Sequence, residues 1–442
     1  VSEKSQPSSR RPASGRRTVA RHGELRSPHP FASLMKIVGI MLAVVLVSGA
    51  GIAAYAVTDI ATGFADEAVE LEGQDTVPPD IGAIEGGVNM FLAGTDACEP
   101  EYAQFFGDRC SGADSEGELN DVNMLVHISD EPRRVTVVSF PRDLMVEIPS
   151  CTREDGSESS PQSYAPINSA FSVGGLSCVV KTVSQLSGQN IPFAAKVTWG
   201  GVIEITDAVG GVEVCLASGI RDVNTGIDWP AGNRTIQGIE ALQFLRTRYG
   251  VGDGSDLGRI SNQQQYMSRL ARKLISGEVL SDPATLYRLA TTTVDNVTPS
   301  QSLTNPLTLV QIALAVRDVP FDEIVFVQYP VLTDPYDENK VVPDEASASV
   351  LWDAIAANQP LTLTGEAGAN EGVVVVEDGE PAPEDGGEAA PEDGGEVAPE
   401  EGGEAVEPTP APTETSVALP STIPGSTAAQ ETCSNGNLRG FG

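Results

Sequence analysis

Residues 135–143 read Val-Thr-Val-Val-Ser-Phe-Pro-Arg-Asp, and this stretch decides the fold that the sequence predicts. Its first six residues are mostly β-branched or aromatic, which is typical of a buried strand. Pro141 ends strand pairing because it has no backbone N–H, so Arg142 and Asp143 fall at the strand's end. Ligands bind at strand ends in α/β proteins, and charges there are costly unless something neutralises them. This strand end is therefore the first candidate site.

Similar β-branched runs alternate with helical patterns over residues 86–275. Strands are predicted at Val88–Leu92, Asn123–Ile128, Val135–Phe140, Ala194–Thr198 and Val212–Leu216, and helices at Val179–Leu186, Ile239–Thr247 and Ile260–Ile275. The alternation predicts one α/β core with a central mixed sheet flanked by helices.

Residues 276–363 predict an extension of this core. The expected elements are helices around Pro283–Thr293, Leu307–Arg317 and Glu345–Ala357 and a strand at Ile324–Tyr329. No flexible linker separates the two stretches, so we expect the extension to pack on the core.

The first 85 residues predict a single-pass membrane anchor. Residues 1–36 carry eight Lys or Arg against two Glu and predict a disordered cytoplasmic tail. Residues 37–57 contain no charge and are long enough for a transmembrane helix, which places the rest of the chain outside the cell. Residues 58–85 are expected to form a stalk. A cleaved signal peptide is the alternative, because Ala54-Tyr55-Ala56 has the small-x-small pattern of a cleavage site.

The cysteines and the net charge agree with an extracellular domain. All six cysteines follow the predicted membrane segment, in a compartment where disulfides persist. Cys98 with Cys110 is the first expected pair and Cys178 with Cys215 the second, although spacing alone leaves other arrangements open. The net charge of −35 argues against nucleic acid as a partner.

Residues 364–442 differ sharply in composition. An eight-residue unit recurs from Pro383, Pro391 and Pro399, and sixteen acids and no base lie between Glu366 and Glu414. Such an acidic, Pro/Gly-rich segment cannot bury a core, so an extended low-complexity tail is predicted. Cys433 is either free or attaches the far side of this tail to the domain.

Further charged residues stand next to apolar runs, as Arg142 and Asp143 do. They are Asp96, Asp121, Arg246, Arg248, Asp256 and Arg259. Taken singly, each has an ordinary explanation as a surface ion pair, a turn residue or a helix cap. Taken together, several arginines and two or three carboxylates suit a divalent metal and a phosphorylated ligand.

The motifs around these residues resemble the LytR-CpsA-Psr family of cell-wall glycopolymer ligases, of the type found in actinobacteria. The resemblance extends from about Asn89 to Gln265 and continues more weakly to about residue 360. Its motifs are Phe91–Asp96, Asn120–Leu125, Ser139–Asp143, Ile167–Phe171 with Gly174-Gly175, Val209–Val214, Gly238–Leu242 leading into Arg246-Thr247-Arg248, and Asp256–Arg259 before Gln263-Gln264. It implies a three-layer α/β fold.

The resemblance also implies roles for the matching residues. Asp96 and Asp121 would hold Mg²⁺ against a pyrophosphate. The phosphates of this pyrophosphate would be bound by Arg142, Arg246, Arg248 and Arg259, with Gln263 nearby. Asp143 and Asp256 complete the expected substrate-binding set, where either accepts a proton or orients an arginine. The lipid of a polyprenyl-pyrophosphate-linked glycopolymer would lie in an apolar tunnel.

The chain departs from the family pattern in two places. Many members have Arg two residues before the second metal-binding Asp, where this chain has Leu119, and Arg before the Gln pair, where it has Asn262. The spacing from Asp96 to Asp121 is also long, and Arg109 in this insertion is a candidate for supplying the missing phosphate contact.

The expected reaction is a Mg²⁺-dependent phosphotransfer at the cell membrane. A hydroxyl of peptidoglycan attacks the sugar-side phosphorus and polyprenyl phosphate leaves, which forms a phosphodiester link. One alternative is hydrolysis at the same site with water as the acceptor. Another is a non-catalytic regulatory protein of the cell wall that only holds polyprenyl phosphate. The sequence does not identify the polymer, for which arabinogalactan, teichoic acid and capsule are all open.

Overall fold

The computed structural model describes residues 62–65, 68–75, 87–111, 117–275, 279, 282–376 and 416–437. All of them belong to one compact unit, Asp59–Gly442. The predicted cytoplasmic tail, the predicted membrane span at residues 37–57 and the acidic repeats lie outside the described residues. Among the residues that are described, no helix has both the length and the apolar character that crossing a membrane requires.

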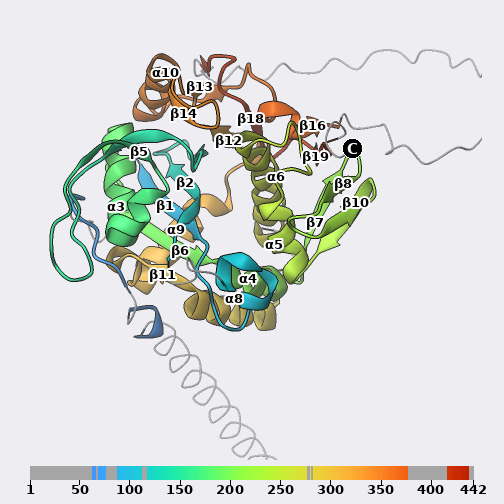
Figure 1. Cartoon of the computed structure of the whole chain (residues 1–442), viewed down its shortest axis with the longest axis horizontal. Helices are drawn as coiled ribbons and strands as arrows, with labels where there is room; N and C mark the ends of the chain where they lie inside the picture. The colour runs from blue at the N-terminus through green and yellow to red at the C-terminus, as the bar shows by residue number, and fades with distance from the viewer. Residues whose placement is uncertain are drawn as a thin grey trace, which may run out of the picture. The chain divides into compact units, whose positions relative to one another are not determined.

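A seven-stranded mixed sheet forms the centre of the unit (Figure 1), in the order β11-β6-β1-β2-β3-β12-β18. Its strands are β1 (Val88–Thr95), β2 (Asn120–Ile128), β3 (Val135–Phe140), β6 (Phe193–Thr198), β11 (Val297–Pro299), β12 (Ile324–Gln328) and β18 (Gly425–Thr427). β1 is parallel to β6 and β3 to β12, whereas β2 is antiparallel to both β1 and β3. The predicted α/β fold with a central mixed sheet is confirmed.

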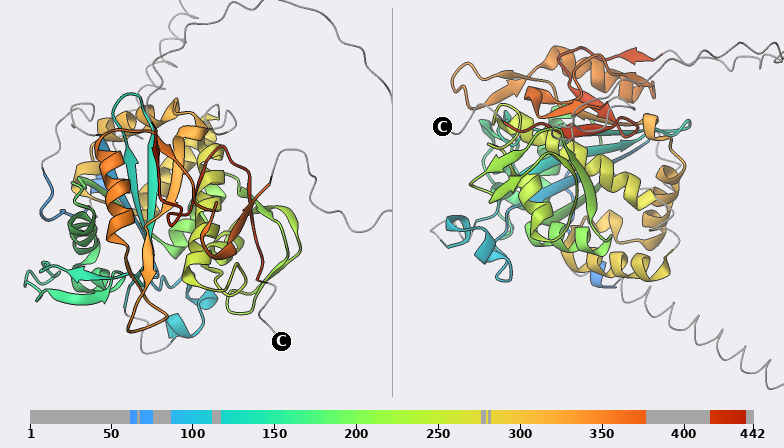
Figure 2. Two further views of the ribbon diagram at one scale, coloured as in Figure 1. Left: turned by 90° about the horizontal axis from the view of Figure 1, so that it is seen from above. Right: turned by 90° about the vertical axis from the view of Figure 1, so that its right-hand side faces the viewer.

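Helices cover both faces of this sheet (Figure 2) because its strands direct apolar side chains to both sides. Phe91 and Leu125 enter a core with α3 (Ser169–Ser187) and α10 (Glu345–Ala356). Met90 and Met124 enter a second core on the opposite face. The helices of that face are α6 (Asp256–Ile275), α8 (Pro283–Asn296) and α9 (Pro306–Arg317). The result is a three-layer arrangement.

A second sheet, in the order β10-β7-β19-β16, packs with α5 (Ile239–Arg246) and α6 around a core of its own. Its strands are β7 (Val212–Leu216), β10 (Gly232–Ile236), β16 (Val373–Val375) and β19 (Thr432–Ser434). The remaining elements are α2 (Asp108–Ser111), α4 (Trp199–Ala208), β4 (Met145–Ile148), β5 (Gln162–Pro166), β8 (Ile220–Asp222), β9 (Ile227–Trp229), β13 (Val331–Thr333), β14 (Val341–Pro343), β15 (Leu361–Thr362) and β17 (Val417–Ala418).

The predicted strands and helices all form, and β3 and β7 match their predicted bounds. α3 begins ten residues earlier than predicted, because the chain turns at Gly174-Gly175 and the helical residues on both sides join across this kink. Gly175 has φ +62° there, a conformation that favours glycine. The sequence pattern did not predict α4, because this helix has two glycines directly after Trp199 and therefore a weak helical signal.

The prediction of one extended tail from residue 364 to residue 442 is wrong for two parts of it. Residues 373–375 form β16, and residues 416–437 return to the domain. β18 pairs with β12 in the central sheet, while β19 lies between β7 and β16 in the second sheet. These strands are short runs with Val, Thr and Ser on either side of the acidic repeats. The repeats dominate the composition of the segment, so the strand signal of the short runs was not recognised.

The disulfides correct a second prediction. Cys98–Cys110 is confirmed, but the expected Cys178–Cys215 pair is wrong, because Cys178 bonds to Cys151 and Cys215 bonds to Cys433. Cys178 lies on α3 over the central sheet, whereas Cys215 lies on β7 in the second sheet. The Cys433 alternative that attaches the far side of the tail is therefore the one that the structure shows.

The described part of the predicted stalk packs on the domain instead of standing free. Val69 forms a β-bridge with Ser300, and Glu72 forms an ion pair with Lys181 at 3.0 Å. Glu72 also accepts a hydrogen bond from the backbone N–H of Thr152. Residues 68–75 are thus part of the folded unit.

The returning C-terminal segment leads to a stability prediction. Truncation after Gly365 removes β16–β19 and the Cys215–Cys433 bond. We expect it to lower the free energy of unfolding by about 3–5 kcal/mol or more, because a disulfide that closes a long loop contributes about this much. Deletion of residues 383–406, which removes only the three repeats, should leave the melting temperature unchanged. Thermal unfolding of both variants, in buffer that contains neither an oxidant nor a reductant, checks these expectations. A truncated chain as stable as the parent would contradict the stabilising role of the C-terminal segment.

Candidate active site

Strand order brings the predicted site residues to one edge of the central sheet. β2 is antiparallel to β1 and β3, so the start of β2 lies beside the ends of both neighbours. Asp96 follows β1, Asp121 is the second residue of β2, and Arg142 and Asp143 follow β3. The N-terminus of α6 adds Asp256 and Arg259 from the adjoining layer.

These charges form an alternating chain of ion pairs. Arg142 Nη1 donates to Asp121 Oδ1 at 2.7 Å, and Arg142 Nε lies 3.5 Å from carboxylate oxygens of both Asp143 and Asp256. Arg259 Nη2 forms an ion pair with Asp256 Oδ1 at 2.6 Å and donates a hydrogen bond to the backbone carbonyl of Asp121 at 3.2 Å. The side chains of Asp256 and Arg259 are only 8% and 6% exposed, so this pair lies in the interior.

The arrangement favours the ionised forms of Asp121 and Arg142. Burial alone would raise the pKa of Asp121, but Arg259 and Arg142 outweigh it and hold this pKa below its usual value. Burial opposes the charge of Arg142 in the same way, and Asp121 and Asp256 nevertheless raise its pKa. Two buried N–H groups, Arg142 Nε and Arg259 Nε, still have no hydrogen-bond acceptor among the described residues.

Arg246 differs from these arginines because it stacks on aromatic rings. Its guanidinium carbon lies 4.0 Å from the ring centroid of Trp199 and 5.3 Å from that of Phe106. The guanidinium makes no hydrogen bond or ion pair with any residue that the structure describes. Burial lowers the pKa of Arg246, with Asp121 and Asp96 acting in the opposite direction. Cation–π stacking fixes the plane of the guanidinium and leaves its N–H groups for a ligand.

The end of α5 is held in place by the α6 residues that follow the motif. Gln263 Nε2 donates to the carbonyl of Leu245 at 3.0 Å, and Asn262 Nδ2 donates to the carbonyl of Phe244 at 2.7 Å. These bonds satisfy carbonyls that a helix C-terminus leaves open. Gln263, expected near the pyrophosphate, therefore positions Arg246 through the backbone. Asn262 stands where many family members have an arginine, and here it has a structural role, because its Oδ1 also accepts a hydrogen bond from Ser434 of β19.

Arg248 depends on a residue that the sequence analysis missed. Asp222 is 1% exposed, and its Oδ2 accepts hydrogen bonds from the Thr247 hydroxyl and from the backbone N–H groups of Arg248 and Tyr249. The Arg248 side chain then reaches the carbonyl of Gly254 at 3.2 Å. Asp222 stands at the end of a three-residue strand without a distinctive pattern, so nothing in the sequence singled it out.

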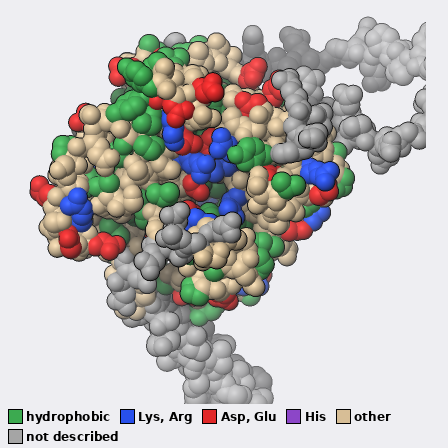
Figure 3. Space-filling model, viewed as in Figure 1, with side chains coloured by type: hydrophobic (Ala, Val, Ile, Leu, Met, Phe, Trp, Pro, Cys, Tyr) green, Lys and Arg blue, Asp and Glu red, His purple; other side chains and the backbone are tan. Residues whose placement is uncertain are grey.

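The arginines line a polar pocket of about 190 Å³. Figure 3 shows basic and acidic side chains gathered around a hollow near the centre of one face of the molecule. The pocket residues are Asp121, Arg142, Asp222, Asn224, Thr225, Arg246, Arg248, Tyr249 and Arg259. The predicted clamp of Arg142, Arg246, Arg248 and Arg259 is thus brought together in one pocket.

A second cavity of about 200 Å³ adjoins this pocket and is almost entirely apolar. It shares Asp121, Arg246 and Arg259 with the polar pocket. The rest of its lining comes from β1, β2, β6 and helices α4–α6: Leu92, Ala93, Gly94, Val122, Met124, Val197, Trp199, Val202, Ile205, Leu242, Leu245, Gln263, Tyr266, Met267 and Leu270. Charged and apolar binding surfaces therefore meet at three residues.

The predicted Mg²⁺ pair does not offer two open carboxylates. Asp96 Oδ2 accepts from Arg109 Nε at 2.7 Å, and Asp96 Oδ1 accepts from Arg109 Nη2 at 2.9 Å and from the backbone N–H of Leu119 at 2.7 Å. Asp121 is paired with Arg142. The described residues contain no cluster of three or more His, Cys, Asp or Glu arranged for a metal ion. The donor set at Asp96 therefore does not fit a bound Mg²⁺ in this arrangement, and Arg109 contacts Asp96.

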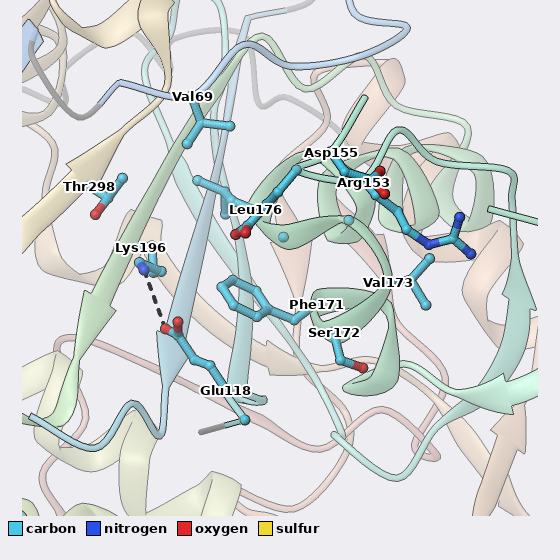
Figure 4. Close-up of a pocket in the computed structure, with 14 residues that line it drawn as sticks. Val69, Glu118, Arg153, Asp155, Phe171, Ser172, Val173, Leu176, Lys196 and Thr298 are labelled. Atoms are coloured by element: carbon cyan, nitrogen blue, oxygen red, sulfur yellow. Dashed lines mark ion pairs between the residues drawn. The ribbon is translucent and has the colours of Figure 1, made fainter. Parts of the chain in front are cut away.

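A larger cavity of about 590 Å³ lies beside β6 and α3 (Figure 4) and contains none of the predicted site residues. Lys196 and Glu118 form an ion pair at 3.3 Å within it, and Lys196 Nζ lies 5.6 Å from the ring centroid of Phe171. Its charged lining residues are Glu118, Arg153, Glu154, Asp155 and Lys196. With more acids than bases, this cavity is less suited to a diphosphate than the arginine pocket.

The role of Asp222 can be tested through stability. Asp222→Ala leaves the hydroxyl of Thr247 and three backbone N–H groups without their acceptor, which should lower the free energy of unfolding by about 2–3 kcal/mol. Asp228→Ala changes an exposed carboxylate of the neighbouring strand β9 and should alter this free energy by no more than about 0.5 kcal/mol. Denaturant unfolding measures both, and equal stability of the two variants would contradict the assignment.

Comparisons with known sequences identify relatives of the chain. The profile of the LytR_cpsA_psr family matches residues 55–356. The cell wall biosynthesis protein LcpA of Corynebacterium glutamicum is 28% identical, and the match covers 81% of this chain and 68% of that protein. The probable cell wall biosynthesis protein LcpB of the same organism is 28% identical over 65% of each chain. The polyisoprenyl-teichoic acid–peptidoglycan teichoic acid transferase TagU of Enterococcus faecalis is 26% identical over 40% of this chain and 54% of its own. The chain thus spans about two thirds of the first two relatives and about half of the third.

Solved structures also resemble the chain. The LytR-Csp2A-Psr enzyme from Actinomyces oris gives a TM-score of 0.47 with 21% identity, over 65% of this chain and 95% of that chain. TagT bound to LI-WTA gives a TM-score of 0.48 with 16% identity, over 66% of this chain and 98% of that chain. Because the family profile covers more than half of the sequence, this protein belongs to the LytR-CpsA-Psr family.

Proposed function

We propose that this protein transfers a glycopolymer from a polyprenyl diphosphate carrier to a hydroxyl of peptidoglycan and leaves a phosphodiester link. The observation that carries the proposal is the junction of the arginine pocket with the apolar cavity at Asp121, Arg246 and Arg259. A lipid-linked diphosphate has the same two parts, an anionic head and an apolar chain. The names of LcpA and TagU, which describe cell wall biosynthesis and transfer of teichoic acid to peptidoglycan, support the same assignment.

The four arginines divide into two kinds in this proposal. Arg246 and Arg248 form no ion pair with a described carboxylate, so they are the arginines that bind the phosphate oxygens. Arg142 and Arg259 are already paired, and they contribute their remaining Nε–H donors. Planar guanidinium groups match phosphate oxygens with paired hydrogen bonds, which makes a pocket of arginines a suitable diphosphate site.

In the proposed reaction an acceptor hydroxyl forms a new P–O bond with the sugar-side phosphorus. The bond from this phosphorus to the bridging oxygen breaks, and polyprenyl phosphate leaves with the electron pair. Phosphoryl transfer of this kind requires mainly positioning and neutralisation of charge. The arginines supply both, since they face the oxygens on which charge develops. The hydroxyl proton passes to solvent water in the open pocket.

Asp143 and Asp256 orient the arginines in this mechanism. Asp143 forms an ion pair with Lys340 at 2.5 Å and lies beside Arg142, while Asp256 is held between Arg142 and Arg259. A carboxylate with two cationic partners is better suited to fixing their positions than to removing a proton.

We further propose that residues 37–57 anchor the protein in the cell membrane and that the domain is extracellular. The pairing of all six cysteines in three disulfides supports an oxidising compartment. The negative net charge of the chain supports the absence of a nucleic-acid partner.

Arg246→Ala tests the arginine assignment. We expect this substitution to reduce transfer at least about 100-fold, because losing one preformed donor to the developing charge typically has an effect of this size. Arg317→Ala is the matched control, since Arg317 is an exposed arginine whose partner is its neighbour Asp318. The full-length protein in detergent is incubated with a polyprenyl-diphosphate-linked glycan and peptidoglycan, and the polymer bound to peptidoglycan is quantified. The assignment would be contradicted if both variants lost transfer to the same extent, or if neither variant lost it.

The products of the wild-type reaction distinguish the competing functions. Glycan bound covalently to peptidoglycan supports transfer. Release of soluble glycan phosphate, with none bound to peptidoglycan, would replace the proposal with hydrolysis. Binding of the lipid with no product of either kind would replace it with a non-catalytic, lipid-binding role.

A further inference from the structure

Asp96 is a buried carboxylate whose oxygens are all engaged. It is 5% exposed, and Arg109 contacts it with two parallel hydrogen bonds while the backbone of Leu119 adds a third. Two parallel bonds between guanidinium and carboxylate are the strongest geometry that such a pair adopts. A Mg²⁺ ion on Asp96 would need the same oxygens at much shorter distances, so metal and arginine exclude each other here.

A disulfide-closed loop holds Arg109 in this place. Cys98 follows Asp96 by two residues, Cys110 follows Arg109 directly, and the two cysteines are bonded. Arg109 Nη2 also donates to the carbonyl of Gly117 at 2.5 Å, and Nη1 contacts Cys98 Sγ at 3.6 Å. The ring of covalent bonds therefore keeps Arg109 close to Asp96.

The same loop supports the phosphate-binding side of the pocket. Its Phe106 is 6% exposed, packs against Trp199 with ring centroids 4.3 Å apart, and lies under Arg246. One loop thus neutralises Asp96 and forms part of the aromatic support of Arg246. Both contacts come from the Cys110 end of the loop, where Phe106 and Arg109 are three residues apart.

The charge balance of the site depends on Arg109. Among the described residues we count the side chains that line the polar pocket, the ion-pair partners of these side chains, Lys340 as the second partner of Asp143, and the Asp96–Arg109 pair. The cations are Arg109, Arg142, Arg246, Arg248, Arg259 and Lys340, and the anions are Asp96, Asp121, Asp143, Asp222 and Asp256. The site has one surplus positive charge with Arg109 and none without it, so removal of Arg109 leaves a doubly negative diphosphate diester without net compensation.

We propose that Arg109 serves as the resident cation of Asp96, in the place that a divalent metal would otherwise take. The protein then binds the diphosphate of its lipid substrate without a metal ion on Asp96. This inference rests on the proposed function and deepens it. It assigns Arg109 as a positioning residue and states that the site binds the diphosphate without a metal ion on Asp96.

The test uses the full-length protein in detergent, with farnesyl diphosphate as the probe and calorimetry as the readout. Binding is measured in EDTA and again in excess MgCl₂. We expect wild-type affinities in the two conditions to agree within about twofold, since arginine already balances Asp96. We expect Arg109→Gln to bind at least about tenfold more weakly in EDTA and to recover in MgCl₂, because the buried Asp96 carboxylate, without its arginine, then needs a metal.

Controls separate this inference from the proposed function. Arg133→Gln, at an arginine paired with Glu131 away from the pocket, should behave as the wild type. Titration with Mn²⁺, followed by electron paramagnetic resonance, should show a site in Arg109→Gln that the wild type lacks. Arg109→Lys, which restores the charge, should recover part of the EDTA affinity.

Wild-type binding that disappears in EDTA and returns with MgCl₂ would overturn the inference while leaving the proposed function standing. This arm needs no variant, so a misfolded Arg109→Gln would not remove the test. Arg109→Gln that matches the wild type in both conditions would also overturn it. A wild type that binds no probe in either condition would overturn the proposed function and this inference together.

Discussion

The neutralisation of carboxylates at one edge of the central sheet is the constraint on which the site depends. Asp96, Asp121 and Asp256 are brought together because β2 runs antiparallel to both of its neighbours and because α6 begins beside them. Asp96 and Asp121 each pair with an arginine from another segment, and Asp256 lies between Arg259 of its own helix and Arg142 of the β3 end. A buried carboxylate without such a partner would be strongly destabilising. Folding of this edge therefore assembles a group of oriented arginines before any ligand arrives.

Parts of the chain that lie far away in sequence hold this group in place. α6 carries Asp256 and Arg259, and its Gln265 donates to carbonyls of Cys215 and Thr432 in the second sheet. The Cys215–Cys433 bond joins the same two strands covalently. The C-terminal segment therefore stabilises the helix that delivers two of the site's charges, although it supplies no residue to the pocket. Contacts of this segment with α6 and β7 therefore help to position Asp256 and Arg259.

Local sequence patterns predicted the main strands and helices and singled out the charged residues, and the family resemblance gave the clamp residues their expected role. Strand ends can be recognised because β-branched runs stop at charged residues, as Val135–Phe140 does before Arg142. Partner choice could not be predicted in this way. The pairing of Arg109 with Asp96, the support of Arg248 by Asp222 and the bonding of Cys433 all depend on contacts between distant segments. Such contacts follow from the packed structure and leave no periodic signal in the sequence. Gln263 shows the same limit, because its position was predicted but its hydrogen-bond partner was not.

In the proposed function, the arginine pocket and the apolar cavity bind the two ends of one lipid diphosphate. An experimental structure of the full-length protein with farnesyl diphosphate bound tests this most directly. We expect phosphate oxygens to contact Arg246 and Arg248 and the isoprenoid chain to lie beside Leu92, Met124 and Leu270. A diphosphate bound in the cavity beside Lys196 and Phe171, or an isoprenoid chain outside the apolar cavity, would contradict it.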